Sequence, residues 1–275
     1  MTIPVPIRGV VFDFHETLVT ARDPGAWVEA AWRHLGRDAS PAAALGPVGF
    51  ERVRTGIAQV WRHAAVIDPD GGRDLDPGRH RAVFQQVMEL SGVEEDLGTA
   101  LYAVMTRQWV PFDDVLPVLA ALREREVATL VLSNVGIDIR DHLDRAGIAA
   151  LVDDVVLSFE VGVVKPRPEI FARALARLRL PADEVLMVGD NARDDTGGVA
   201  LGIRTLILPP VTGPVRGLAA VLGLVDGAAT GRAGVCGAGV DGAEADGAGA
   251  DGAATGRAGS SGAATGWARV DAGTR

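Results

Sequence analysis

The chain has 275 residues, of which 48% are hydrophobic, and it carries a formal net charge of -9 at pH 7. This length allows one domain with a smaller insert, and the composition supports a substantial core and excludes a fibrous or collagen-like protein. The acidic balance argues against nucleic acid as a partner, because binding to a phosphate backbone needs a concentrated basic surface.

An apolar run rich in Val and Phe occupies residues 7–14 and ends at a charged cluster. This pattern is typical of a buried strand of a parallel sheet that ends at a site. The character changes over residues 20–109, where apolar residues recur at helical spacing, as at Phe50, Val53, Ile57, Val60, Trp61 and Ala64. Turn-forming segments such as residues 68–72 separate these stretches. We therefore predict a helical insert, the cap, over residues 20–109.

From residue 111 onward, short apolar strands alternate with amphipathic helices. The strands are expected at 128–132, 155–157, 185–188 and 204–208, and the helices near 115–122, 139–146 and 169–178. This alternation predicts a Rossmann-like parallel α/β sheet, in which ligand sites gather at the carboxyl ends of the strands. The α/β core is accordingly expected over residues 1–19 and 110–225.

The composition changes again after residue 225, where Gly, Ala, Asp and Thr dominate. The nine residues 226–234 recur identically as 251–259. A solenoid needs apolar positions in each repeat to bury, and these repeats have almost none. Burial of so little apolar surface cannot offset the entropy of ordering, so we predict a disordered tail over residues 226–275.

Polar side chains stand at or just beyond the ends of the predicted strands in four short segments, residues 11–18, 130–134, 164–171 and 188–195. The first supplies a carboxylate, Asp13, and the second a hydroxyl, Ser133. The third supplies a cation, Lys165, before a helix start marked by proline, and the fourth an acidic cluster. Together they offer a nucleophile, phosphate ligands and carboxylates for Mg²⁺, which phosphoryl transfer requires.

Lys165 is the only lysine in a chain with 27 lysine and arginine residues. An arginine bias of this kind is typical of a GC-rich coding sequence. Arginine is a broad planar fork, whereas lysine is a compact charge on a flexible stem. We interpret the retained lysine as marking a position where the geometry excludes arginine.

The four segments, in this order and with a helical insert after the first, resemble motifs I to IV of the haloacid dehalogenase (HAD) superfamily over about residues 7–210. The resemblance implies a Mg²⁺-dependent phosphatase that acts on a small phosphorylated metabolite. It implies that Asp13 is the nucleophile and forms an aspartyl-phosphate. It further implies that Thr17, Ser133, Asn134 and Lys165 contact the phosphoryl group. For Asn134, orientation of the nucleophile and the capping of a turn are alternatives.

The resemblance also implies a set of metal ligands. These are Asp13, the backbone carbonyl of His15, Asp190 and a second acidic residue of the fourth segment. Both Asp194 and Asp195 have a spacing found in the family, and the residues that follow, 197–203, align more naturally with Asp194 in that role.

Two positions beside Asp13 depart from the family pattern. His15 stands where the family phosphatases carry a second aspartate, the general acid and base. Because histidine can transfer protons near neutral pH, we expect His15 to take over this role. Glu16 replaces the usual glycine and adds bulk and charge beside the nucleophile.

Three functions are compatible with these residues. A phosphomonoester phosphatase is favoured, with a phosphotransferase such as a mutase as a variant. A haloacid dehalogenase would share the aspartate nucleophile but needs no Mg²⁺, and the acidic fourth segment argues against it. The departures at His15 and Glu16 leave a catalytically weak binding protein as the third alternative.

The remaining histidines and the tryptophans of the insert are expected to have structural rather than catalytic roles. Spacing typical of metal ligands is absent from the other histidines, which we expect on helix surfaces: His34, His63, His80 and His142. The tryptophans of the insert are expected to pack inside it.

The single cysteine, Cys236, cannot form an internal disulfide, which fits a reducing compartment. No basic segment precedes the first apolar run, which Arg8 and Asp13 interrupt, so no signal peptide is expected. No apolar run reaches the length of a membrane span. These features predict a cytoplasmic protein without a membrane partner.

Overall fold

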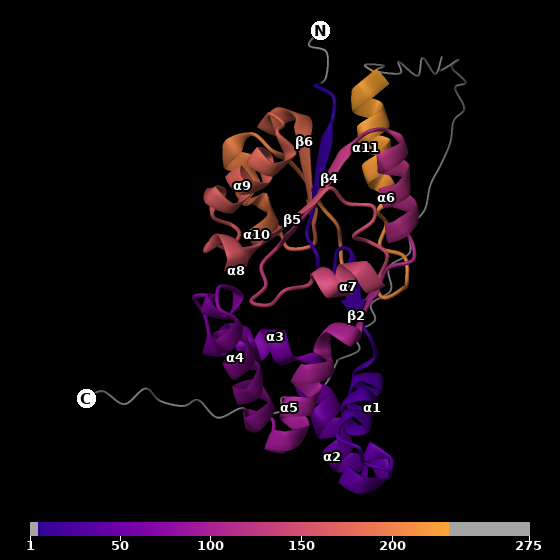
Figure 1. Ribbon diagram of the computed structural model, residues 1–275, viewed down its shortest axis with the longest axis vertical. Helices are drawn as coiled ribbons and strands as arrows, with labels where there is room; N and C mark the ends of the chain where they lie inside the picture. Colours follow the sequence, from indigo (N-terminus) through magenta and orange to yellow (C-terminus); the bar gives the residue numbers. More distant parts are fainter. Residues whose placement is uncertain (1–4, 231–275) are drawn as a thin grey trace, which may run out of the picture. The chain divides into compact units, whose positions relative to one another are not determined.

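The computed structural model describes residues 5–230, and their longest strands form a five-stranded parallel sheet of order β5-β4-β1-β6-β7 (Figure 1). The strands are β1 (Gly9–Phe12), β4 (Ala128–Ser133), β5 (Asp154–Leu157), β6 (Val185–Gly189) and β7 (Arg204–Ile207). β1 lies in the middle of the sheet, between β4 and β6. The predicted parallel α/β sheet is confirmed.

Helices cover both faces of this sheet (Figure 1). Side chains of β1 point alternately to the two faces, so that Val10 and Phe12 join one buried apolar cluster and Val11 joins the other. This burial on both faces explains why the strand is apolar at every position. One face carries α6 (Val115–Glu124) and α11 (Ala219–Thr230), and the other carries α8 (Ser158–Val161), α9 (Pro168–Leu178) and α10 (Ala192–Asp195). Shorter elements are α7 (Arg140–Arg145), η3 (Ala182–Glu184) and η4 (Thr196–Leu201).

Helices also fill the insert between β1 and β4, which lies beyond one end of the sheet (Figure 1). They are α1 (Pro24–His34), α2 (Pro41–Ala58), α3 (Val60–Ile67), η1 (Gly72–Asp74), α4 (Pro77–Leu90), α5 (Glu95–Val104) and η2 (Met105–Arg107). Three of them begin at a proline that follows a capping side chain, Asp23, Ser40 or Asp76, which accepts a backbone N–H of the first turn. The chain enters and leaves the insert through an antiparallel ribbon that we did not predict, β2 (Val19–Ala21) and β3 (Trp109–Pro111).

Helix α11 crosses the predicted boundary between the core and the tail at residues 225 and 226 and continues to Thr230. The prediction was wrong here because tertiary contacts outweigh composition. Val225 is buried, and the Asp226 carboxylate accepts two hydrogen bonds from the Arg125 guanidinium. The rest of the predicted tail, with Cys236, lies outside the described residues. Within residues 5–230, no helix combines the length and the apolar character that crossing a membrane requires.

Two of the histidines expected on helix surfaces are buried instead, His80 and His142. The Nδ1 atom of His80 lies 2.9 Å from the Tyr102 hydroxyl, and burial lowers the pKa of His80 to about 4. The Nδ1 atom of His142 lies 2.9 Å from the backbone carbonyl of Thr106. Both rings therefore have a hydrogen-bonding partner inside the protein, which makes their burial tolerable.

Candidate active site

A cavity of about 270 Å³ opens where β1, β4 and β6 end. Phe12 at the end of β1 is level with Val131 of β4 and Val188 of β6. Because the three strands are parallel, the residues that follow them meet at one edge of the sheet. The lining of the cavity comes from these strand ends and, on the opposite side, from the insert. All four sequence segments singled out for chemistry contribute side chains to it.

Asp13 directly follows β1 and lines the cavity. Its N–H donates to the Val188 carbonyl at 2.9 Å, which extends the β1–β6 pairing by one residue. Its carboxylate accepts from Lys165 Nζ on Oδ1 at 2.6 Å and from the Thr17 hydroxyl on Oδ2 at 3.3 Å. Thr17, expected to contact phosphate, is fully buried and is not a lining residue of the cavity. In this structure the Thr17 hydroxyl orients Asp13.

Lys165 lies between two carboxylates and is 4% exposed. Its Nζ donates to Asp13 and also to Asp195 Oδ1, in each case at 2.6 Å. Burial by itself lowers the pKa of Lys165, but the carboxylates of Asp13 and Asp195 outweigh this effect and hold the pKa above its usual range. A permanent positive charge is thus fixed beside the carboxylate of Asp13.

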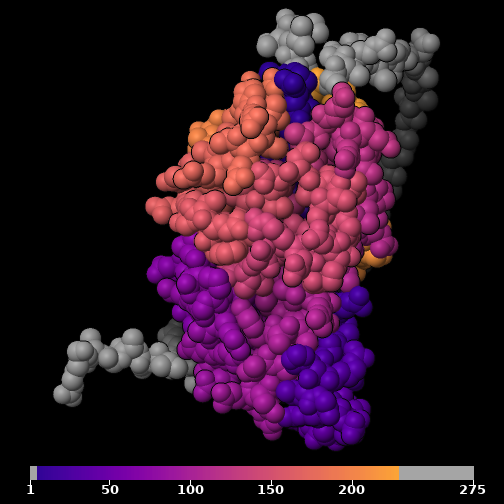
Figure 2. Space-filling model, in the orientation of Figure 1, coloured from indigo at the N-terminus to yellow at the C-terminus, as the bar shows by residue number. Residues whose placement is uncertain are grey.

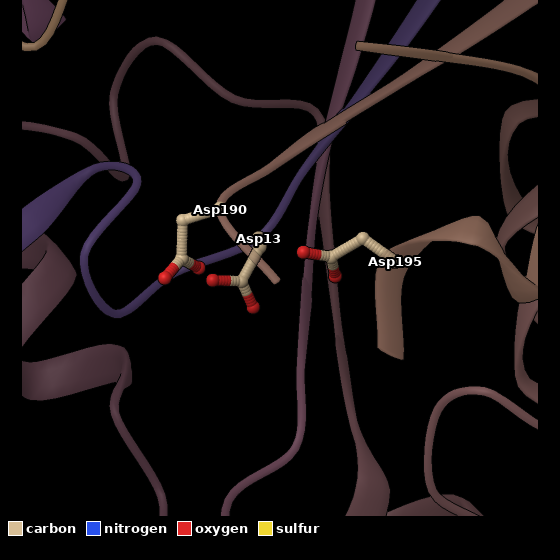
Figure 3. A group of neighbouring side chains, drawn as sticks. All are labelled: Asp13, Asp190 and Asp195. Carbon is tan, nitrogen blue, oxygen red and sulfur yellow. The ribbon is translucent and has the colours of Figure 1, made fainter. Parts of the chain in front are cut away.

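The second acidic residue of the group is Asp195. Oxygens of Asp13, Asp190 and Asp195 all lie within 4.8 Å of one another. Figure 3 shows Asp13 and Asp190 side by side, with Asp195 reaching toward Asp13 from α10. Asp194, which the sequence alignment favoured, lies outside this group and accepts from Asn191 Nδ2 at 2.8 Å. The geometry therefore supports Asp195, the alternative, as the partner of Asp13 and Asp190.

Gly189 makes the position of Asp195 possible. A Cβ atom at residue 189 would lie 2.0 Å from Asp195 Oδ2, so no other residue fits without moving that carboxylate. The same oxygen accepts from the Asn191 N–H at 3.0 Å. A glycine directly before Asp190 is thus a sequence signal for a buried carboxylate that packs against the end of β6.

The carboxylates of this site repel one another. Burial, together with the negative charges of Asp13 and Asp195, raises the pKa of Asp190 to about 6. Burial and Asp13 also raise the pKa of Asp195, against the opposing effect of Lys165. Clustered carboxylate oxygens that one lysine does not neutralise are a donor set suited to a hard divalent cation. The residues therefore fit Mg²⁺.

Ser133 and Asn134, at the end of β4, also line the cavity. The Asn134 side chain makes two hydrogen bonds to the backbone of Lys165: its Oδ1 accepts from the N–H at 2.7 Å, and its Nδ2 donates to the carbonyl at 3.0 Å. This two-point contact positions Lys165, a task that the sequence did not suggest. Ser133 is buried beneath the cavity with 3% exposure.

His15 and Glu16 form the wall next to Asp13. Burial lowers the pKa of His15, while the nearby carboxylates of Glu16 and Asp13 raise it to a lesser extent. The Nε2 atom of His15 is shielded from solvent and makes no hydrogen bond within the described residues. Glu16 has a φ of 59°, in the left-handed region that favours glycine. This backbone conformation gives a physical reason for the glycine that the family pattern has here.

Five residues of the insert complete the cavity: Trp61, Arg73, Asp74, His80 and Trp109. No sequence motif indicates a function for these residues, although Arg73 and Asp74 lie just after the predicted turn at residues 68–72. The Nη2 atom of Arg73 is 3.5 Å from Asp74 Oδ2. Burial raises the pKa of Asp74 to about 6.

Comparisons with known proteins agree on one family. Residues 7–202 match the sequence profile of the haloacid dehalogenase-like hydrolases. The chain is 33% identical over 135 residues to the phosphoserine phosphatase of Thermus thermophilus, a match that covers 47% of this chain and 54% of that protein. It is 27% identical over 216 residues to haloacid dehalogenase-like hydrolase domain-containing protein 3 of Danio rerio, covering 74% and 86% of the two chains.

A solved structure supports the same fold. L-2-haloacid dehalogenase from Xanthobacter autotrophicus superimposes with a TM-score of 0.54 at 21% identity, over 80% of this chain and 84% of that one. At this identity the likeness concerns the fold alone. Among the curated relatives, the phosphatase matches extend over 54% of the phosphoserine phosphatase and 38% of a glyceraldehyde 3-phosphate phosphatase of Methanopyrus kandleri, less than two thirds of either protein.

Proposed function

The chain belongs to the haloacid dehalogenase-like hydrolase family, and we propose that it hydrolyses small phosphomonoesters with the help of Mg²⁺. The observation that carries the proposal is the group of Asp13, Asp190 and Asp195 with Lys165 among them. A bound Mg²⁺ would supply charge neutralisation for the phosphoryl oxygens. A dehalogenase needs no Mg²⁺, so a group of three carboxylates suited to that ion favours a phosphatase over a dehalogenase.

The proposed chemistry starts at Asp13. A carboxylate oxygen of Asp13 attacks phosphorus, the bond from phosphorus to the leaving oxygen breaks, and the phosphoryl group is held as an aspartyl-phosphate. Lys165 balances negative charge beside the reacting oxygens, and Ser133 contributes a hydroxyl hydrogen bond to the phosphoryl group. Water then attacks phosphorus and releases inorganic phosphate and free Asp13. Asp13, Asp190, Asp195 and the His15 carbonyl would hold the metal.

Mg²⁺ removal is the first test of this proposal. Purified protein treated with EDTA and dialysed should release less than about 1% of the phosphate that the Mg²⁺-loaded protein releases from p-nitrophenyl phosphate, since one lysine cannot offset the clustered carboxylates and a phosphate dianion. Addition of Mg²⁺ should restore the rate. Folded protein that releases no phosphate with Mg²⁺, from this ester or from a panel of alkyl phosphates, would contradict the proposed function. In that case, chloride release from 2-chloropropionate would identify a dehalogenase.

His15 is proposed to transfer protons during this reaction. Its buried Nε2 has no hydrogen-bond partner in residues 5–230, so its hydrogen-bonding capacity is unused and could serve a leaving oxygen or a water that enters with the substrate. Because burial lowers its pKa, the neutral imidazole predominates near neutral pH, which favours the general-base half of the cycle, activation of the hydrolytic water.

We expect His15→Ala to slow steady-state turnover by about 10²- to 10⁴-fold, the usual contribution of general acid–base catalysis. With p-nitrophenyl phosphate, whose leaving group needs no proton, the variant should release a rapid burst of p-nitrophenol before the slow phase, since hydrolysis of the aspartyl-phosphate becomes limiting. His15→Asp, which restores the family residue, is the matched control and should remain active. Full turnover of an alkyl phosphate by His15→Ala would exclude the proton-transfer role.

A further inference from the structure

The cavity wall contributed by the insert carries a charge pair whose two members neutralise each other. Among the described residues that line the cavity, two side chains are permanent cations, Lys165 and Arg73. Lys165 is engaged by Asp13 and Asp195. Arg73 faces Asp74 at 3.5 Å, and its Nη1 donates to the carbonyl of the buried Asp68 at 3.0 Å. Neither cation is therefore free to bind a second anionic group of a substrate.

The turn that carries this pair, η1, is held in place on one side by other residues of the insert. The Asp68 carboxylate is 1% exposed and accepts the Arg73 N–H at 2.6 Å. The same carboxylate also pairs with Arg79. Asp68 thus fixes both the backbone and the guanidinium of Arg73, so the orientation of the Arg73–Asp74 pair is set before any ligand arrives.

The domain that contains the five-stranded parallel sheet contacts η1 on its other side. The Ser158 hydroxyl donates to the Asp74 carbonyl at 2.5 Å. A Cβ atom at Gly136 would lie 2.0 Å from the Arg73 carbonyl oxygen, so the loop after β4 reaches the turn only because residue 136 is glycine. In Figure 2 the purple surface of the α3–α4 segment adjoins the pink surface of the parallel-sheet domain. The pair therefore lies beside the loop that follows β4 and lines the same cavity as Ser133 and Asn134.

We infer that the Arg73–Asp74 pair selects phosphate esters whose leaving group carries no net negative charge and presents hydroxyl groups. A hydroxyl can donate to Asp74 and accept from Arg73 without breaking their contact. A carboxylate or a second phosphate on the leaving group would have to compete with Asp68 and Asp74 for Arg73. It would also meet the negative charges of Asp74 and Asp194, which line the same cavity. This inference rests on the proposed phosphatase function and deepens it by naming a substrate class.

Inhibition constants of matched esters test the inference. Glycerol 3-phosphate and 3-phosphoglycerate share a carbon skeleton and differ by a hydroxymethyl group in place of a carboxylate. Each is used as a competitor against p-nitrophenyl phosphate with the Mg²⁺-loaded protein, which gives a constant whether or not the competitor is itself hydrolysed. Wild type should bind glycerol 3-phosphate at least about tenfold more tightly, the order expected for one unfavourable charge contact at this range.

The variant Asp74→Asn should bring the ratio of the two inhibition constants close to unity, because it releases the Nη2 atom of Arg73 from its ion pair and removes one repelling carboxylate. Asp70→Asn, an exposed aspartate of the same loop, is the matched control and should keep the wild-type ratio. Equal binding of the two esters by wild type, tighter binding of 3-phosphoglycerate, or a ratio that Asp74→Asn leaves unchanged would overturn the inference. Absence of phosphate release from both p-nitrophenyl phosphate and the alkyl phosphate panel would instead contradict the proposed function, so the two failures are distinguishable.

Discussion

Asp13→Asn is expected to lower kcat for every phosphate ester by about 10⁴-fold or more while the protein remains folded. The amide cannot act as the nucleophile, and removal of a covalent catalyst leaves only binding and electrostatic effects. Stability should stay within about 1 kcal/mol of wild type, because the amide oxygen can still accept from Lys165 and the mutual repulsion with Asp190 and Asp195 decreases. Phosphate release and urea unfolding measure the two quantities separately.

The matched control for this variant is Asp114→Asn. Asp114 lies away from the cavity lining, and its carboxylate accepts the backbone N–H groups of Arg216, Gly217 and Leu218. It should show the opposite pattern, a loss of stability of about 1–3 kcal/mol with kcat nearly unchanged. Acid-quenched wild type should also yield a phosphorylated peptide that contains Asp13. Substantial turnover by Asp13→Asn would show that another group is the nucleophile.

The sheet was predictable from sequence because its central strands are buried on both faces. Such strands give uninterrupted apolar runs, and the polar residues that end them, Asp13, Ser133 and Asp190, stand out by contrast. Because the strands are parallel, these residues meet at one edge of the sheet, and this meeting can be predicted without knowing any side-chain contact. For the same reason, the three residues were identified as one site from the sequence alone.

Contacts between distant segments were not predictable in this way. Arg73 and Asp74 have no local feature that separates them from exposed arginines and aspartates of the insert, and only the approach of Gly136 and Ser158 places them on the cavity. The choice of Asp195 over Asp194 depends on which side of α10 faces the Gly189 backbone. The end of α11 likewise depends on Asp226 meeting Arg125, a contact between residues 101 positions apart in the sequence.

Lys165→Arg is expected to lower both activity and stability, although it keeps the positive charge. The Lys165 side chain is almost fully enclosed, and Nζ reaches both Asp13 and Asp195 at 2.6 Å. A guanidinium is broader than an ammonium, so it would displace at least one of these carboxylates. We expect a loss of about 1–3 kcal/mol in stability from overpacking and a fall in kcat of about 10²-fold or more, since the position of Asp13 changes. Arg167→Lys, an exchange at an exposed position two residues further on, should leave both quantities unchanged.

Lys165→Met separates the charge of this side chain from its shape. Methionine has nearly the length of lysine but no charge, so the carboxylates of Asp13, Asp190 and Asp195 would remain clustered without a cation. We expect the metal-free variant to lose about 3–5 kcal/mol of stability, the usual effect of removing one partner of a buried charge pair, and kcat to fall by about 10³-fold. Urea unfolding and phosphate release measure the two losses. If Lys165→Arg instead kept full activity, the geometry of the site would not exclude arginine. The single lysine of this arginine-rich chain would then have been retained by chance.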